Sequence, residues 1–284
     1  MFYPARPFTL SFELFPPKTP AAEAALWENL KHLMEFQPDV VTCTYGAGGS
    51  TRDKTLAIVQ QTKRRFGVRV ASHLTCVGST VEQLVSYLGD AQRRGIENIV
   101  ALRGDPPKGE ASFKPVEGGL RFASELVGLI RREFPRFGIA VAGYPETHQE
   151  AASPQADMEN LKRKVAAGGH CVITQLFYDN ADFFRFRQRC GELGITVPIV
   201  PGILPVTNLS QIQRITSLCK ARLPDDFVAE LSQKDDADWQ FAVGVRWAAR
   251  QLQELIDAGV PGLHFYVLNK SPATAAVLNQ VRRP

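Results

Sequence analysis

The sequence predicts an α/β protein, a (β/α)8 TIM barrel with extra helices before the last strand. Short apolar runs alternate about eight times with longer segments whose apolar residues recur every three or four positions. Several of the short runs are continuously hydrophobic, which is typical of parallel strands covered on both faces. A chain of 284 residues has the usual size of such a barrel, so we expect residues 1–284 to form one domain.

The short apolar runs predict strands at residues 9–15, 40–44, 68–75, 98–102, 139–143, 171–176, 197–202 and 262–267. The first strand must end at Pro16, because proline has no backbone N–H to donate. The helical spacing predicts helices at residues 21–36, 52–66, 81–94, 122–134, 157–167, 182–193, 209–218 and 272–281. Segment 224–259 exceeds this count and is expected to hold the extra helices, the second of them capped by Asp238.

Composition excludes several classes of protein. The net charge is +4 with both signs interspersed and no dense Lys/Arg cluster, so nucleic-acid binding is not indicated. The five cysteines are scattered and form no CxxC, which argues against a disulfide framework or a zinc site, and we predict no metal. The N-terminus lacks a signal-peptide pattern and no window approaches 18 apolar residues. We therefore expect a cytoplasmic protein without membrane contact.

Glu13 is the unusual residue of the first predicted strand, because it lies between Phe12 and Leu14. An ionised carboxylate is costly to bury unless it is paired, hydrogen-bonded or protonated. Glu13 is therefore a candidate general acid, and the alternative is a side chain that points to solvent from an edge strand.

Polar residues follow the predicted strands, at the end of a barrel where active sites lie. Each also has a structural interpretation. His73 could be a core histidine bonded to backbone, and Arg103 and Asp105 could form an ion pair across a turn at Gly104. Tyr45 and Tyr144 could be packing aromatics, and the charged helix face at 157–164 could be solvated. The glycines at 46–49 do not spell GxGxxG, so a Rossmann site is not supported.

The strand-end stretches together resemble the methylenetetrahydrofolate reductase family. The resemblance spans the chain and rests on SFELFPPKT (11–19), VTCTYGAGGSTRDKT (41–55), SHLTC (72–76), IVALRGDPP (99–107), VAGYPETHQEA (141–151), QADMENLKRKVAAGGHCVITQLFYD (155–179), IVPGILPVTN (199–208) and LHFYVLNKS (263–271). LRGDPP, GYPETH and PGILPVTN are highly specific in combination. The chain ends just after the barrel and so resembles the short bacterial form, without the regulatory domain of animal enzymes.

This resemblance implies a catalytic domain in one-carbon metabolism and methionine supply. NADH or NADPH reduces bound FAD and leaves, and 5,10-methylenetetrahydrofolate then takes the hydride to become 5-methyltetrahydrofolate, a ping-pong mechanism. Glu13 matches the acid that protonates N10, a role for which apolar neighbours should raise its pKa. Asp105 matches an aspartate between pterin and flavin, and Gln175 a residue facing substrate and nicotinamide. The family also commonly forms dimers or tetramers, so we expect a homo-oligomer.

The positions matched to FAD binding are Thr44, Tyr45, Ala47, His73, Arg103, Gly104, Asp105, Ala123, Tyr144, His148, Ala151, Asp157, Asn160, Arg163 and Lys164. Gln211 and Lys270 match positions near the substrate tail or the nicotinamide nucleotide. Two matches depart from relatives: Lys270 stands where some have Arg, and Ile215 where at least one has Phe. Alternatives are another flavin barrel of the proline dehydrogenase kind, a folate or nucleotide binder without turnover, and a Schiff-base aldolase. The aldolase needs a lysine at a strand end, where Gln175 stands instead.

Overall fold

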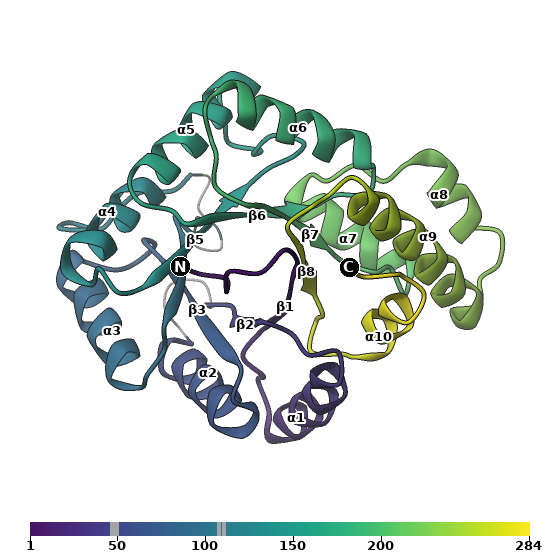
Figure 1. Cartoon of the computed structure of the whole chain (residues 1–284), viewed down its shortest axis with the longest axis horizontal. Helices are drawn as coiled ribbons and strands as arrows, with labels where there is room; N and C mark the ends of the chain where they lie inside the picture. Colours follow the sequence, from purple (N-terminus) through teal and green to yellow (C-terminus); the bar gives the residue numbers. More distant parts are fainter. Residues whose placement is uncertain (46–50, 107–108, 110–111) are drawn as a thin grey trace.

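The computed structural model of the chain describes residues 1–45, 51–106, 109 and 112–284. Within them, parallel strands close into a barrel in sequence order, which confirms the predicted (β/α)8 fold (Figure 1). The strands are β1 (Thr9–Leu14), β2 (Val40–Cys43), β3 (Arg69–Thr75), β4 (Asn98–Leu102), β5 (Gly138–Gly143), β6 (Cys171–Leu176), β7 (Ile199–Ile203) and β8 (Gly262–Tyr266). The barrel closes where Ser11 of β1 pairs with His264 of β8.

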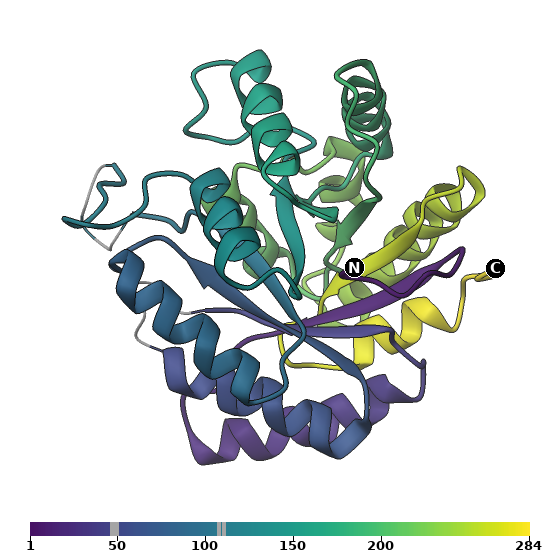
Figure 2. The same ribbon diagram turned by 60° about the vertical axis from the view of Figure 1, so that its left-hand side comes forward.

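Helices surround the barrel, as the rotated view in Figure 2 also shows. They are α1 (Pro20–Met34), α2 (Arg52–Phe66), α3 (Val81–Arg93), α4 (Ala123–Glu133), α5 (Pro154–Ala166), α6 (Asn180–Glu192), α7 (Leu209–Cys219), α8 (Asp225–Leu231), α9 (Ala237–Asp257) and α10 (Pro272–Leu278). The extra helices expected before the last strand are α8 and α9. None of the helices described is long and apolar enough to cross a membrane.

Three predicted helix starts are wrong, and capping explains them. Helix α6 begins at Asn180 rather than 182, because the Asp179 carboxylate accepts a hydrogen bond from the Ala181 N–H. Helix α5 begins at Pro154 rather than 157, because the Ser153 hydroxyl accepts a hydrogen bond from the Ala156 N–H. The N-cap of α9 is Asp236 rather than Asp238: its carboxylate accepts from the Trp239 N–H at 2.7 Å. Each segment offers several capping residues, and only the fold selects which one lies before the first turn.

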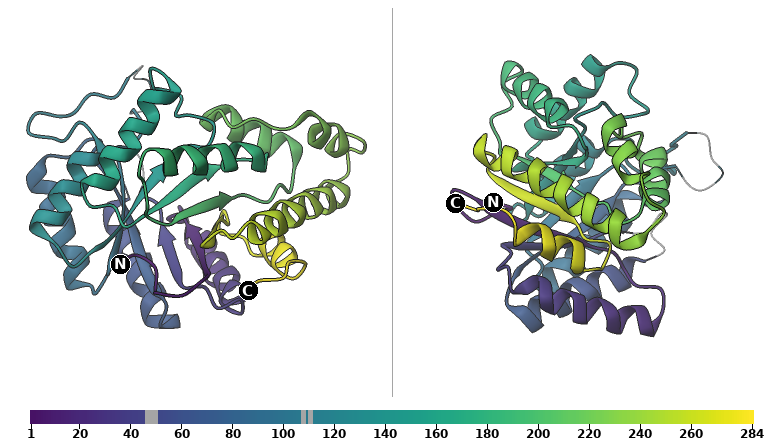
Figure 3. Two further views of the ribbon diagram at one scale, coloured as in Figure 1. Left: turned by 45° about the horizontal axis from the view of Figure 1, so that its top comes forward. Right: turned by 90° about the vertical axis from the view of Figure 1, so that its right-hand side faces the viewer.

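The two ends of the barrel differ. At the end where the strands begin, Phe2 and Tyr3 are buried against residues of β2 to β7 and fill the interior. Figure 3 shows both chain termini on this side of the molecule. At the end where strands β6 and β7 finish, α7, α8 and α9 pack together, with Phe227 stacked on Trp247 at a ring-centroid distance of 4.3 Å. Phe2 and Tyr3 therefore close the interior at the end where the strands begin.

Candidate active site

A cavity of about 630 Å³ lies at the carboxyl ends of the strands. It brings together most of the predicted site residues, from β1 to β6: Glu13, Thr44, Tyr45, His73, Arg103, Gly104, Asp105, Ala123, Tyr144, His148, Ala151, Asp157, Asn160, Arg163, Lys164 and Gln175. Gln211 borders a separate, much smaller cavity beside Ile215. Lys270 is exposed and is not among the residues described as lining either cavity. Ala47 lies outside the described residues.

Glu13 points into the barrel, because alternate residues of a strand face opposite sides and Phe12 and Leu14 face the helices. Its carboxylate Oε2 lies 3.2 Å from His73 Nε2 and 3.3 Å from His264 Nε2. The other ring nitrogen of His264 is 2.8 Å from Ser11 Oγ. Glu13 is thus held between two imidazoles, and the solvent-facing alternative is wrong, since only 15% of its side chain is exposed.

The expected rise in the pKa of Glu13 is wrong for the ligand-free chain. Burial does raise the pKa, as its apolar neighbours predict, but the His73 and His264 imidazoles act in the opposite direction and prevail. Together these effects lower the pKa of the Glu13 carboxyl to about 2. His73 accordingly is not a core histidine bonded to backbone, because its Nε2 faces the carboxylate.

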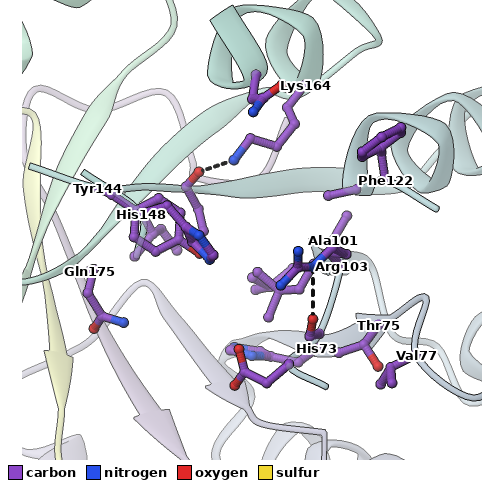
Figure 4. Close-up of a pocket in the computed structure, with 18 of the residues that line it drawn as sticks. His73, Thr75, Val77, Ala101, Arg103, Phe122, Tyr144, His148, Lys164 and Gln175 are labelled. Atoms are coloured by element: carbon purple, nitrogen blue, oxygen red, sulfur yellow. Dashed lines mark hydrogen bonds between the residues drawn. The ribbon is translucent and has the colours of Figure 1, made fainter. Parts of the chain in front are cut away.

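Cationic and aromatic side chains line the wall formed by β5 and α5 (Figure 4). The Lys164 ammonium donates to the Ala142 carbonyl at 2.6 Å and lies 5.7 Å from the centre of the Tyr144 ring. Burial lowers the pKa of Lys164 to about 8, and the nearby Asp157 carboxylate counteracts part of that effect. The Tyr144 and His148 rings pack edge to face at 4.6 Å.

The loop after β5 orients this wall through a strained residue. Thr147 has a φ of 81°, which is rare for a β-branched side chain. On one side of it, Glu146 accepts a hydrogen bond from the Arg222 N–H at 2.9 Å. On the other side, the His148 N–H donates to Asp157 Oδ2 at 2.9 Å. The turn at Thr147 therefore directs Glu146 toward the α7–α8 connection and His148 toward the cavity.

Arg103 and Gly104 shape the wall that follows β4. Arg103 donates to Glu150 Oε2 at 2.6 Å, so it does not form the ion pair with Asp105 that the sequence allowed. Gly104 has a φ of 88°, and an added Cβ would lie 2.8 Å from Val77 Cγ1, so the predicted tight turn requires glycine. Asp105 follows directly and is exposed at the cavity.

Gln175 and Thr75 both offer a polar group to a ligand in the cavity. Gln175 Oε1 accepts from the Leu176 N–H at 2.9 Å, so the side-chain NH₂ group remains to donate. The Thr75 hydroxyl is buried, borders the cavity and has no hydrogen-bond partner among the residues that the structure describes. An unsatisfied buried hydroxyl is destabilising, so a ligand that bonds to it gains affinity.

Sequence reasoning missed His264 and Glu150, which contact predicted site residues. His264 could have been found, because it alternates with Tyr266 on β8, and both therefore face the barrel interior. Glu150 had no such signal, since it lies in the loop between β5 and α5 and only the folded turn brings it to Arg103.

Comparisons with known proteins agree with this geometry. The family described as "Methylenetetrahydrofolate reductase" matches residues 3–282. The chain is 42% identical over 270 residues to the Escherichia coli 5,10-methylenetetrahydrofolate reductase, covering 94% of this chain and 88% of that protein. It is 39% identical over 279 residues to the Arabidopsis thaliana methylenetetrahydrofolate reductase (NADH) 1, covering 94% of this chain and 47% of the plant protein.

A solved structure shares the fold: a Clostridium thermocellum protein that binds two copies of 5-methyl-5,6,7,8-tetrahydrofolic acid. Its TM-score is 0.60 at 13% identity, over 96% of this chain and 94% of that one. The match of the family over nearly the whole length, together with identities near 40%, decides the assignment. This chain belongs to the methylenetetrahydrofolate reductase family.

Proposed function

We propose that this chain reduces 5,10-methylenetetrahydrofolate to 5-methyltetrahydrofolate, with FAD as its resident cofactor and NADH or NADPH as the electron donor. The observation that carries the proposal is that one cavity brings together Glu13, Asp105 and Gln175 with nearly all of the residues matched to FAD, in a chain of this family. The whole chain, residues 1–284, is proposed to act as one catalytic domain.

The cavity residues fit a flavin dinucleotide. A cavity of about 630 Å³ is within the size range of sites for large organic ligands. The cations of Arg163 and Lys164 suit a pyrophosphate, and the unpaired Thr75 hydroxyl offers a hydrogen bond. Tyr45, Tyr144 and His148 provide aromatic surface for the ring systems. When bound there, FAD would supply the hydride transfer, which amino acid side chains cannot perform.

Glu13 is proposed to deliver the proton to N10 that opens the five-membered ring of the folate. In the ligand-free chain the imidazoles of His73 and His264 favour the carboxylate form. Substrate that covers the site would exclude water and strengthen the burial effect, which raises the pKa. The two imidazoles lie close enough to Oε2 for one proton to be shared among the three groups. Glu13 would then receive its proton from an imidazolium of this cluster, which would become a neutral imidazole.

Two further side chains are proposed to hold the substrate. Asp105 places a negative charge at the cavity, where it would stabilise the cationic iminium that ring opening creates. Gln175 would donate its NH₂ group to the pterin or to the nicotinamide amide. Glu13, Asp105 and Gln175 line the same cavity as the residues matched to FAD, which supports the ping-pong order, because folate and nicotinamide would have to approach the flavin there in turn.

An anaerobic absorbance experiment tests the proposal. The purified protein is examined for bound flavin, NADH or NADPH is added, and 5,10-methylenetetrahydrofolate follows. We expect the flavin to bleach with the nucleotide and to reoxidise with the folate. Bleaching without folate-driven reoxidation would favour another flavin barrel. A colourless protein that cannot be reconstituted with FAD would refute the proposed cofactor.

Homo-oligomerisation and a cytoplasmic location stay predictions.

A further inference from the structure

The N-terminal segment closes the barrel at the end opposite the cavity. Phe2 and Tyr3 are 1% and 8% exposed, and they pack against the first part of several strands. Figure 1 shows this segment crossing the centre of the barrel. Gly138 of β5 accommodates it, because a Cβ there would lie 2.8 Å from both Cα and N of Phe2. The absence of a side chain at Gly138 therefore makes room for the backbone of Phe2.

A chain of hydrogen-bonding groups runs from Tyr3 through the barrel interior to Glu13. The Tyr3 hydroxyl is 2.8 Å from Ser11 Oγ, which is 2.8 Å from His264 Nδ1, and His264 Nε2 is 3.3 Å from Glu13 Oε2. Ser11 and His264 have no exposed surface. The chain therefore connects the closed end of the barrel to the cavity without passing through solvent.

Donation along this chain can start at Tyr3. Burial raises the pKa of the Tyr3 phenol well above its ordinary value, so Tyr3 keeps its proton and can donate it to Ser11 Oγ. The Ser11 hydroxyl has two acceptors within reach, His264 Nδ1 at 2.8 Å and the Leu263 carbonyl at 3.3 Å. Donation to the nearer Nδ1 would leave the His264 proton on Nε2, which faces the Glu13 carboxylate.

We propose that Tyr3 is a positioning residue for Glu13, whose hydroxyl acts through Ser11 and His264 to fix the imidazole tautomer and to support the carboxylate. The proposal rests on the acid role of Glu13 proposed above. Tyr3 does not touch the cavity, so its influence is limited to the cooperative strengthening that successive hydrogen bonds give one another.

Other groups also act on both ends of the chain. Glu13 faces the imidazoles of His73 and His264, and its charge adds to the effect of burial in raising the pKa of Cys43 and of Tyr266. Burial, and to a smaller extent Cys171 and Asp39, raise the pKa of Tyr3. All of these remain when only the Tyr3 hydroxyl is removed, so that one deletion isolates the contribution of the chain.

The test is Tyr3→Phe, which keeps the buried ring and deletes the hydroxyl. We expect NAD(P)H-driven flavin reduction to be unchanged. We expect the pH profile of folate-driven flavin reoxidation to move upward by a few tenths of a unit, because a weaker Nε2–H···O contact supports the carboxylate less. The matched control is Tyr178→Phe, which deletes another buried tyrosine hydroxyl, one that donates to the Leu204 carbonyl at 3.2 Å, and it should leave the profile in place.

A double-mutant cycle shows whether Tyr3 acts through Ser11. Ser11→Ala should shift the profile in the same direction, and Tyr3→Phe added to it should shift the profile no further. A second readout needs no cofactor: NMR of the ring nitrogens of His264 in the flavin-free protein should report a changed tautomer population in Tyr3→Phe. The chain has five histidines, so single substitutions can assign these signals.

The outcomes separate this inference from the proposed function. An unshifted profile and an unchanged His264 tautomer in Tyr3→Phe would overturn the inference, even if Glu13→Gln abolishes folate reduction. An equal shift in Tyr178→Phe, or loss of fold or flavin in Tyr3→Phe, would also overturn it, because the hydroxyl would then serve general stability. Normal folate reduction in Glu13→Gln would instead refute the acid role itself.

Discussion

At Glu13, burial and two imidazoles act in opposite directions on one carboxyl. Sequence context revealed only the first effect, since Phe12 and Leu14 are its chain neighbours, whereas His264 is 251 positions away. Apolar neighbours in sequence therefore cannot fix the sign of a pKa shift in a barrel, because the groups that face a side chain come from other strands.

The lowered pKa of Glu13 predicts a dependence of stability on pH. Because the folded-state pKa is depressed from 4.5 to about 2, ionised Glu13 stabilises the fold fully above pH 4.5. That stabilisation is lost as the pH falls toward 2, and it amounts to at most about 3.5 kcal/mol at about 1.4 kcal/mol per unit. Urea unfolding of wild type and Glu13→Gln should give free-energy differences that shrink between pH 5 and pH 2.5. A difference that does not change with pH would contradict the ion-pair geometry.

Lys164 provides a residue-scale test of the cofactor site. Lys164→Met should weaken FAD binding by about tenfold or more, because it removes a cation from the wall where the pyrophosphate is proposed to bind. The measurement is quenching of flavin fluorescence during reconstitution of the flavin-free protein. Lys162→Met is the control, since Lys162 is exposed on the same helix and does not line the cavity. Equal losses in both variants would indicate a general charge effect.

At the scale of elements, α9 supports the loop that leads from β7 to α7. Gly244 of α9 allows this contact, since a Cβ there would lie 1.9 Å from the Val206 carbonyl oxygen. Gln240 of the same helix accepts a hydrogen bond from the Leu209 N–H at 2.9 Å. Helix α9 therefore fixes where α7 begins, and with it the position of Gln211.

Gly244→Ala should destabilise the protein by about 1–3 kcal/mol, because the backbones of α9 and the β7–α7 loop would have to separate. Gly128→Ala is the control: this glycine is also inside a helix, α4, but nothing lies within 4 Å of an added Cβ. It should stabilise the fold by about 0.5–1 kcal/mol through helix propensity. Thermal unfolding of both variants measures the contrast, and two changes of the same sign would refute the contact.

The elements were largely predictable because their signals are local. Continuous apolar runs located the strands to within a few residues, and three- and four-residue spacing located the helices. The start of α9 was not predictable, since Asp236 and Asp238 are equally good caps and tertiary contacts choose between them. The ion pair of Arg103 with Glu150 was missed for a related reason, because the conformation of the loop decides it.

At the scale of the whole molecule, the two ends of the barrel differ, because one end is closed and the other holds the cavity. The N-terminal segment fills the end where the strands begin, and the cavity occupies the end where they finish. Membership of the methylenetetrahydrofolate reductase family supports the chemistry that is proposed for the cavity. Most residues of the cavity wall were predicted from the sequence through its resemblance to the family. The hydrogen-bond network of Glu13 was not predicted, because it forms only where β1 pairs with β8.

The most direct test of the account compares the two half-reactions of wild type and Glu13→Gln by anaerobic stopped flow. Glu13→Gln should retain bound flavin and its reduction by NADH or NADPH. It should lose about 10²- to 10⁴-fold or more in folate-driven reoxidation, the usual contribution of a general acid. A folate half-reaction at the wild-type rate would contradict the central claim, because a glutamine cannot deliver the proton to N10.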